Sequence, residues 1–254
     1  MMKVTFELKS IMNIYKTRKY VLALALLLTG GIVKAQVTIH GDVYGGGNLG
    51  EVRDDATVNM RGGTLKSCLY GGGKGSIDNV ESGLVKGNTK VDVKGGIVEH
   101  SLYGGGELGS VGTFTEFYNL PTGAHVAGEP KTCATGTGKT EVLISGGQVG
   151  IDEAVMPDVG STTYEDDMGY VFCGSRGEAD TLTYPSANLF AVVKETHLKI
   201  SGSALITASA YGGSENGLVM GDTHVEIAGG QIGTGYDRTS KCMMVDMMRK
   251  NGLR

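Results

Sequence analysis

The sequence predicts an all-β protein, a parallel β-solenoid of about six glycine-rich coils. Two observations lead to this prediction. A short phrase of one aromatic residue and several glycines recurs along the chain, and a second phrase of alternating apolar and polar residues precedes the later copies. Glycine is abundant, at 43 of 254 residues against 4 prolines. Because glycine weakens regular elements by about 0.5–1 kcal/mol relative to alanine, so many glycines indicate turns and close backbone approaches.

The first phrase reads VYGGGNLGEV from Val43, LYGGGKGSI from Leu69, LYGGGELGSV from Leu102, VFCGSRGE from Val171 and AYGGSENGLV from Ala210. Five copies in one order indicate a repeat protein, in which each unit buries its apolar face by stacking on the next. We expect the aromatic residues to form an internal ladder of stacked rings. A platform on which sugars stack is the alternative. The ladder residues are Tyr44, Tyr70, Tyr103, Phe172 and Tyr211.

The second phrase, T-x-[VL]-x-[VI]-x-G-G, has the periodicity of a strand with one buried face. Its clearest copies begin at Thr89, Thr140, Thr196 and Thr223. The glycine runs that follow are typical of corners between strands. A twisted antiparallel β-meander or sandwich is the alternative fold, since hairpins also join short strands.

Residues 1–35 read as a secretory signal peptide, with cleavage expected before Gln36 and an ordinary start at Met12. Basic residues precede an apolar run from Val21 to Val33, which is shorter than the roughly 20 residues of a membrane span. Cleavage removes six of the 23 basic residues and one of the 27 acidic residues, which leaves a formal charge of −9. This charge disfavours nucleic acid and anionic membranes as partners.

The glycine-rich repeats occupy residues 36–233, with insertions near 112–137, 151–169 and 178–193, and an atypical C-terminal tail or cap follows at 234–254. Long insertions in repeat proteins often serve recognition, so we expect the binding face there. The second insertion holds acidic residues that are weak calcium candidates without the spacing of a calcium loop, and we expect no cofactor. They are Asp152, Glu153, Asp158, Glu165, Asp166 and Asp167.

Two other features resemble a nucleotide-binding loop and a metal site, but each has a simpler structural interpretation. The string ATGTGKT, from Ala134 to Thr140, is similar to a phosphate-binding loop, but a repeat strand follows it where that loop needs a helix. We therefore expect no nucleotide partner. His197 and His224 hold equivalent positions in neighbouring repeats, yet two imidazoles without a third ligand make a weak metal site. We expect them to be exposed polar partners.

The cysteines and carboxylates predict no catalytic residues. The cysteines are widely spaced and have no CxxC pair, so zinc is not expected and the spacing assigns no disulfide. They are Cys68, Cys133, Cys173 and Cys242. Acidic residues are plentiful, but no arrangement singles out a catalytic pair.

From about Val37 to Gly233, the alternation of TxVxIxGG with VYGGGxxGxV resembles the glycine-rich repeat, adhesin-like surface proteins of gut and oral Gram-negative bacteria. The resemblance implies a secreted or outer-surface β-helix without established chemistry. We therefore expect an exported noncatalytic adhesion or interaction module, which binds an unidentified glycan or protein and self-associates through an exposed solenoid end. The alternatives are a polysaccharide-active β-helix enzyme and a truncated fragment of a longer surface protein.

Overall fold

The structure is a computed structural model that describes residues 37–114, 136–151, 168–178 and 190–233. These residues form strands and no helix, so no helix among them could cross a membrane. The strands are β1 (Thr38–Ile39), β2 (Val43–Tyr44), β3 (Ala56–Leu65), β4 (Leu69–Tyr70), β5 (Thr89–Val98), β6 (Leu102–Tyr103), β7 (Lys139–Ile144), β8 (Gln148–Val149), β9 (Val171–Phe172), β10 (Glu195–Ile200), β11 (Leu205–Ile206), β12 (Ala210–Tyr211), β13 (Thr223–Ile227) and β14 (Gln231–Ile232).

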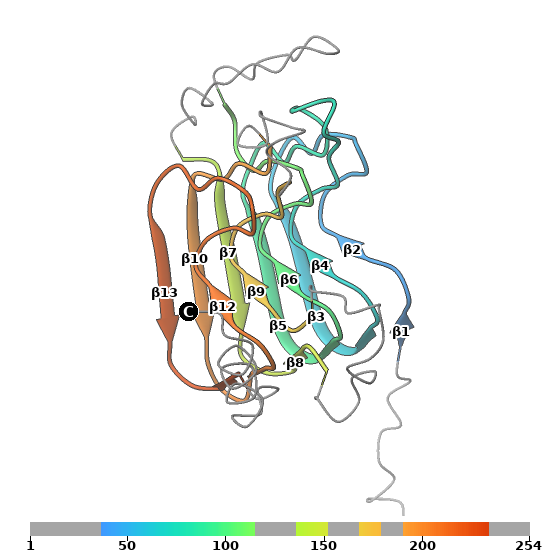
Figure 1. The fold of residues 1–254 in the computed structure, drawn as a ribbon, viewed down its shortest axis with the longest axis vertical. Coiled ribbons are helices and arrows are strands. Elements are labelled where there is room, and N and C mark those ends of the chain that lie inside the picture. Colours follow the sequence, from blue (N-terminus) through green and yellow to red (C-terminus); the bar gives the residue numbers. More distant parts are fainter. Residues whose placement is uncertain (1–36, 115–135, 152–167, 179–189, 234–254) are drawn as a thin grey trace, which may run out of the picture. The chain divides into compact units, whose positions relative to one another are not determined.

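The strands form two parallel sheets, which Figure 1 shows one in front of the other. The large sheet has nine strands and includes β13-β10-β7-β5-β3 as neighbours, and the small sheet has the order β12-β9-β6-β4-β2. All named pairs are parallel, so the antiparallel meander is wrong and the all-β prediction is confirmed. Parallel neighbours need a crossover connection, which the other strands of each repeat supply.

We call the strands at one level of the two sheets a rung. The described strands make six rungs, of which the last has strands in the large sheet only: β1–β2, β3–β4, β5–β6, β7–β9, β10–β12 and β13–β14. Equivalent residues of the second phrase lie opposite one another, as Thr89, Thr140, Thr196 and Thr223 do in turn. A slip of one residue would turn every apolar side chain toward water, so the repeated phrase fixes the register.

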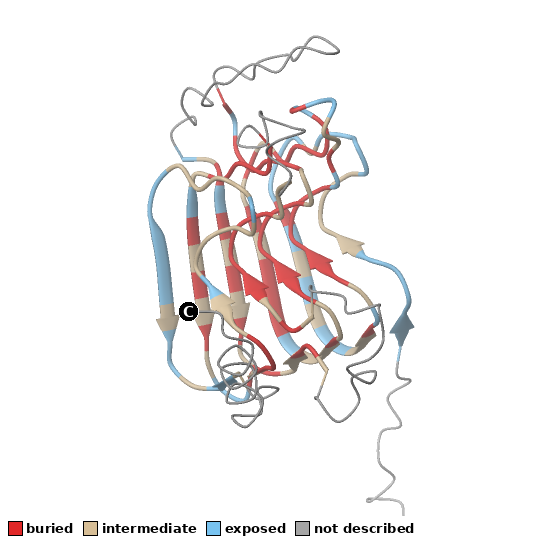
Figure 2. Cartoon of the chain, in the orientation of Figure 1, coloured by how far each residue is buried: buried red, intermediate tan, exposed pale blue. Residues whose placement is uncertain are grey.

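The hydrophobic core lies between the two sheets. Val91, Val142 and Leu198 of the large sheet belong to one buried cluster with Leu102 and Val171 of the small sheet. Figure 2 shows the buried residues on the middle strands, whereas β1 and β13 are mainly exposed. The last rungs at both ends therefore present apolar side chains to solvent, among them Val37, Ile39, Val225 and Ile227.

Glycines shape each rung in two ways. The second glycine of the GG pair has a left-handed backbone at Gly63, Gly96 and Gly147, with φ values of 86°, 95° and 83°. Only glycine adopts this conformation without steric cost. Gly63 and Gly96 lie within β3 and β5, where the pairing is irregular, rather than at a corner between strands, and Gly147 follows the end of β7. The glycine after the aromatic residue is needed for close approach instead: a Cβ on Gly104 would lie 2.0 Å from the carbonyl oxygen of Cys173 in the next rung.

In two rungs a buried threonine of the large sheet donates a hydrogen bond to the carbonyl oxygen of the glycine that follows the aromatic residue, and in one rung it does not. Thr89 Oγ1 donates a hydrogen bond of 2.6 Å to the carbonyl oxygen of Gly104, and Thr196 Oγ1 donates to that of Gly212. In the rung between them, Cys173 stands where the other two rungs have glycine. There Thr140 Oγ1 is buried without a hydrogen-bond partner among the described residues.

This exception predicts opposite effects for one substitution at two equivalent positions. Thr140→Val should raise the free energy of unfolding by about 1 kcal/mol, because an unpaired buried hydroxyl is removed. Thr89→Val should lower it by about 1–3 kcal/mol, because the Gly104 carbonyl loses its donor. Urea unfolding followed by circular dichroism measures both values. Two changes of the same sign would contradict this account.

Candidate functional site

The aromatic residues of the first phrase form one continuous stack. Successive ring centroids from Tyr44 through Tyr70 and Tyr103 to Phe172 are 4.8, 4.8 and 5.3 Å apart, and Tyr211 follows at 4.9 Å. The ring planes are within 5–9° of parallel. We call these five rings the aromatic stack. In-register parallel pairing places equivalent residues of successive rungs directly above one another, and this brings the aromatic rings into contact.

The middle of the aromatic stack is closed to ligands. Tyr70 is 1% exposed and Tyr103 is 0% exposed, so neither ring offers a face to a sugar. Tyr211, the terminal ring of the aromatic stack, is 45% exposed. Sugar stacking along the whole row is therefore excluded, and the interior rings have a structural role.

A column of polar and charged residues covers the hydroxyl ends of the aromatic stack. Its members follow the aromatic residues by four positions: Asn48, Lys74, Glu107, Arg176 and Glu215. Tyr44 donates a hydrogen bond to Glu107, and Tyr103 donates one to Glu215. Burial, followed by these acidic partners, raises the pKa of both tyrosines well above its ordinary value. The hydroxyls therefore stay protonated and act as donors.

The outward face of the large sheet carries a second polar row, formed by Lys90, Glu141, His197 and His224. These residues lie opposite one another on β5, β7, β10 and β13. Lys90 Nζ lies 2.6 Å from Glu141 Oε2, and His197 Nδ1 lies 3.6 Å from Glu141 Oε1. The hydrogen bond from Lys90 lowers the pKa of the Glu141 carboxyl. We call this set the outward row.

A hollow of about 210 Å³ lies at the start of the outward row. That volume is below the roughly 300–1,000 Å³ of most small-molecule sites, so it would accept only a small polar group. Its polar lining consists of Asp55, Thr57, Asn88, Thr89, Lys90, Lys139 and Glu141.

No family model, curated protein or solved structure matches the chain.

The two histidines at the far end of the outward row lie beside a carboxylate. Their ring centroids are 4.9 Å apart, and one ligand atom from each of His197, His224 and Glu226 lies within 4.8 Å of the others. Glu226 is two residues beyond His224 and therefore shares its face of β13. The two-residue spacing from His224 to Glu226 could have indicated a third ligand from the sequence. The sequence-based prediction of a weak metal site rested on the two histidines alone and did not identify Glu226.

Several residues singled out in the sequence lie elsewhere. The calcium candidates between Asp152 and Asp167 are outside the described residues, as are Cys133 and Cys242. Cys173 is fully buried, and burial raises the pKa of its thiol to about 12. It is thus protonated at neutral pH and a poor nucleophile. Thr140 lies in the strand Lys139–Ile144, where the sequence predicted a strand rather than a helix.

Proposed function

We propose that this chain is an exported, noncatalytic β-solenoid that acts as an adhesion or interaction module. The observation that carries the proposal is the in-register parallel pairing through six rungs. Units that stack on their own copies build a scaffold whose outward side chains repeat at regular intervals. The outward row and the polar column beside the aromatic stack are two such sets. A repeated surface of this kind suits recognition of an extended glycan or protein partner.

The charged groups on the described surface support a binding role over catalysis. Lysines lie 2.6 Å from Glu141 and 2.8 Å from Glu226, and their hydrogen bonds lower the pKa of both carboxyls. A general acid that works near neutral pH needs the opposite, a raised pKa. These carboxylates are therefore ionised and paired, which suits electrostatic recognition.

The insertions are the proposed recognition elements. They lie near 112–137, 151–169 and 178–193, for the most part outside the described residues, and the described strands on both sides of each insertion keep the same register. Insertions that leave the pairing intact can vary without cost to the scaffold, as recognition loops do. We also assign self-association to the end rungs, where Ile39 and Ile227 are 43% and 63% exposed.

Expression of residues 1–254 in a Gram-negative host tests the proposal. We expect the mature chain to begin at Gln36, to be accessible to protease on intact cells, and to be retained on an array of surface glycans or cell-surface proteins. An Ala35→Arg variant, which should block cleavage, is the matched control for export. A chain that retains residues 1–35 and stays inside the cell would contradict export.

The enzyme alternative has its own readout. The purified mature chain is incubated with pectin and with other uronate polysaccharides, and new reducing ends are counted. We expect none above a heat-denatured control. A steady release of reducing ends would overturn the noncatalytic assignment and leave the export result untouched.

A further inference from the structure

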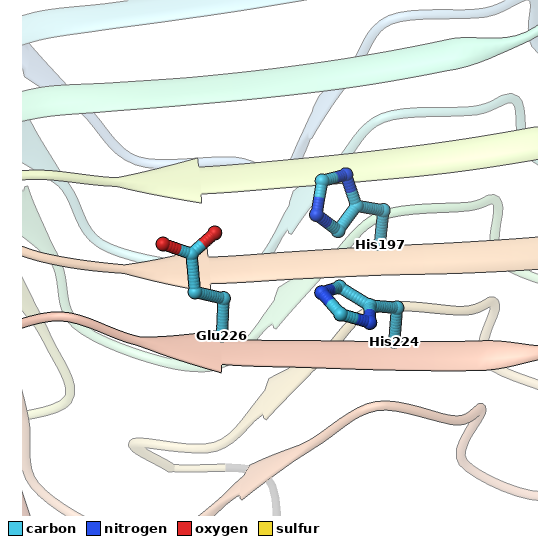
Figure 3. Close-up of side chains that lie close together, drawn as sticks. All are labelled: His197, His224 and Glu226. Atoms are coloured by element: carbon cyan, nitrogen blue, oxygen red, sulfur yellow. The ribbon is translucent and has the colours of Figure 1, made fainter.

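The end of the outward row brings together three groups that bind transition metals. His197 on β10 and His224 on β13 lie directly opposite in the parallel register, and their rings are tilted by 55°. Figure 3 shows Glu226 on the same side of the sheet, with one nitrogen of each imidazole turned toward its carboxylate. Two imidazoles and a carboxylate are the ligand set of many zinc sites.

The distances allow closure around one ion by movement of side chains alone. The three ligand atoms lie within 4.8 Å of one another. Around a tetrahedral zinc ion with bonds of about 2.0–2.1 Å, neighbouring ligand atoms are roughly 3.3 Å apart. The atoms must therefore approach by no more than about 1.5 Å. The side chains of His197 and Glu226 are 28% and 42% exposed, which leaves them room to rotate.

Glu141 lies beside the first histidine. Its Oε1 is 3.6 Å from Nδ1 of His197, so Nε2 is the nitrogen left to face His224 and Glu226. A carboxylate that accepts a hydrogen bond from a histidine ligand fixes the ring and increases its basicity, and Glu141 is the group next to His197 that can do so when the two side chains approach. Lys90 holds Glu141 in turn, at 2.6 Å.

Lys199 is the competing partner of Glu226. Its Nζ lies 2.8 Å from Glu226 Oε1. A carboxylate has about four lone-pair directions, so Glu226 can accept Lys199 on one oxygen while it binds an ion through the other.

We propose that His197, His224 and Glu226 bind one divalent transition-metal ion of the zinc, copper or nickel class. Imidazole ligands select these ions over calcium and magnesium, which prefer six or more oxygens or retain water. The bound ion joins β10 to β13, the exposed strand of the last rung. Its structural effect is to hold the last rung in place.

The test uses the full chain without an affinity tag and with Zn²⁺ as the probe. Isothermal titration is expected to show one ion per chain at this site, together with a rise in Tm. His224→Ala and Glu226→Gln should each weaken binding, by about tenfold or more for the histidine. His40→Ala is the matched control, because it removes an exposed histidine in the first rung.

A spectroscopic readout separates ligation from a general effect on folding. With Cu²⁺ as the probe, electron paramagnetic resonance should show two coordinated nitrogens in the parent chain and one in either His197→Ala or His224→Ala. Since His224 is exposed on the edge strand β13, its alanine variant should retain the circular dichroism of the parent. Unchanged Zn²⁺ affinity and unchanged nitrogen coupling in His224→Ala would overturn the proposal.

Discussion

Gly104→Ala is expected to lower the free energy of unfolding by roughly 3 kcal/mol. The new Cβ would lie 2.0 Å from the carbonyl oxygen of Cys173 and 2.8 Å from a methyl group of Val142. The rungs cannot separate locally without loss of the hydrogen bond from Gly104 N to the Phe172 carbonyl, which is 2.9 Å long. Because a small domain is stable by only about 5–15 kcal/mol, this loss should be plain in urea unfolding.

Gly62→Ala is the matched control for that measurement. Gly62 lies within the strand β3, whereas Gly104 directly follows β6. A Cβ at Gly62 meets no atom within 4 Å, and its φ is not in the left-handed region. Its alanine variant should be as stable as the parent or slightly more so, because alanine reduces the entropy of the unfolded chain. Equal losses in both variants would show that close approach between rungs is not the reason for glycine at position 104.

Tyr103→Ala is expected to cost about 3–5 kcal/mol, the usual range for an aromatic residue removed from a core. The ring is fully buried and stacks on Tyr70 on one side and on Phe172 on the other. Its hydroxyl also donates to Glu215, so the variant leaves that carboxylate without this donor. Chemical denaturation followed by far-ultraviolet circular dichroism measures the loss.

Tyr211→Ala tests whether position within the stack decides the size of the effect. Tyr211, in β12, is the terminal ring of the aromatic stack, where it stacks on Phe172 and is 45% exposed. Its removal should cost no more than about half as much as removal of Tyr103, in proportion to the smaller buried area. A Tyr211→Ala loss as large as that of Tyr103→Ala would refute the view that burial between neighbouring rungs provides the stability.

The repeated phrases predicted strands because their period directly reflects which side chains are buried. Thr140, Val142 and Ile144 are buried in β7, while Glu141 and Leu143 between them are partly exposed. The interval of 69 residues between Tyr103 and Phe172 was ambiguous in the sequence. The structure places β7 and β8 there as a regular rung and keeps its third strand, β9, in register after the insertion.

The polar neighbours were harder to find because they depend on how the rungs align. Glu107, Arg176 and Glu215 lie four residues after the aromatic residue of their own rung, but each contacts a tyrosine of another rung, so the spacing becomes meaningful only when the aromatic rings stack. Glu226 likewise joins the histidines only because β13 pairs with β10 without a shift. The rung of Cys173 shows the limit: its Thr140 hydroxyl lacks the hydrogen bond that the equivalent threonines make, although the phrase around Thr140 is the same.

The matched register of the rungs also bears on how such a chain can change its length. In β3, β5, β7 and β10, the residues at Val58, Val91, Val142 and Leu198 occupy one position of the large sheet. Loss of one whole rung would bring together two strands that already have the same apolar and polar pattern. Recombination between repeats could therefore remove or add one whole rung at a time. In each product, the two strands that become neighbours would have matching patterns of buried and exposed residues.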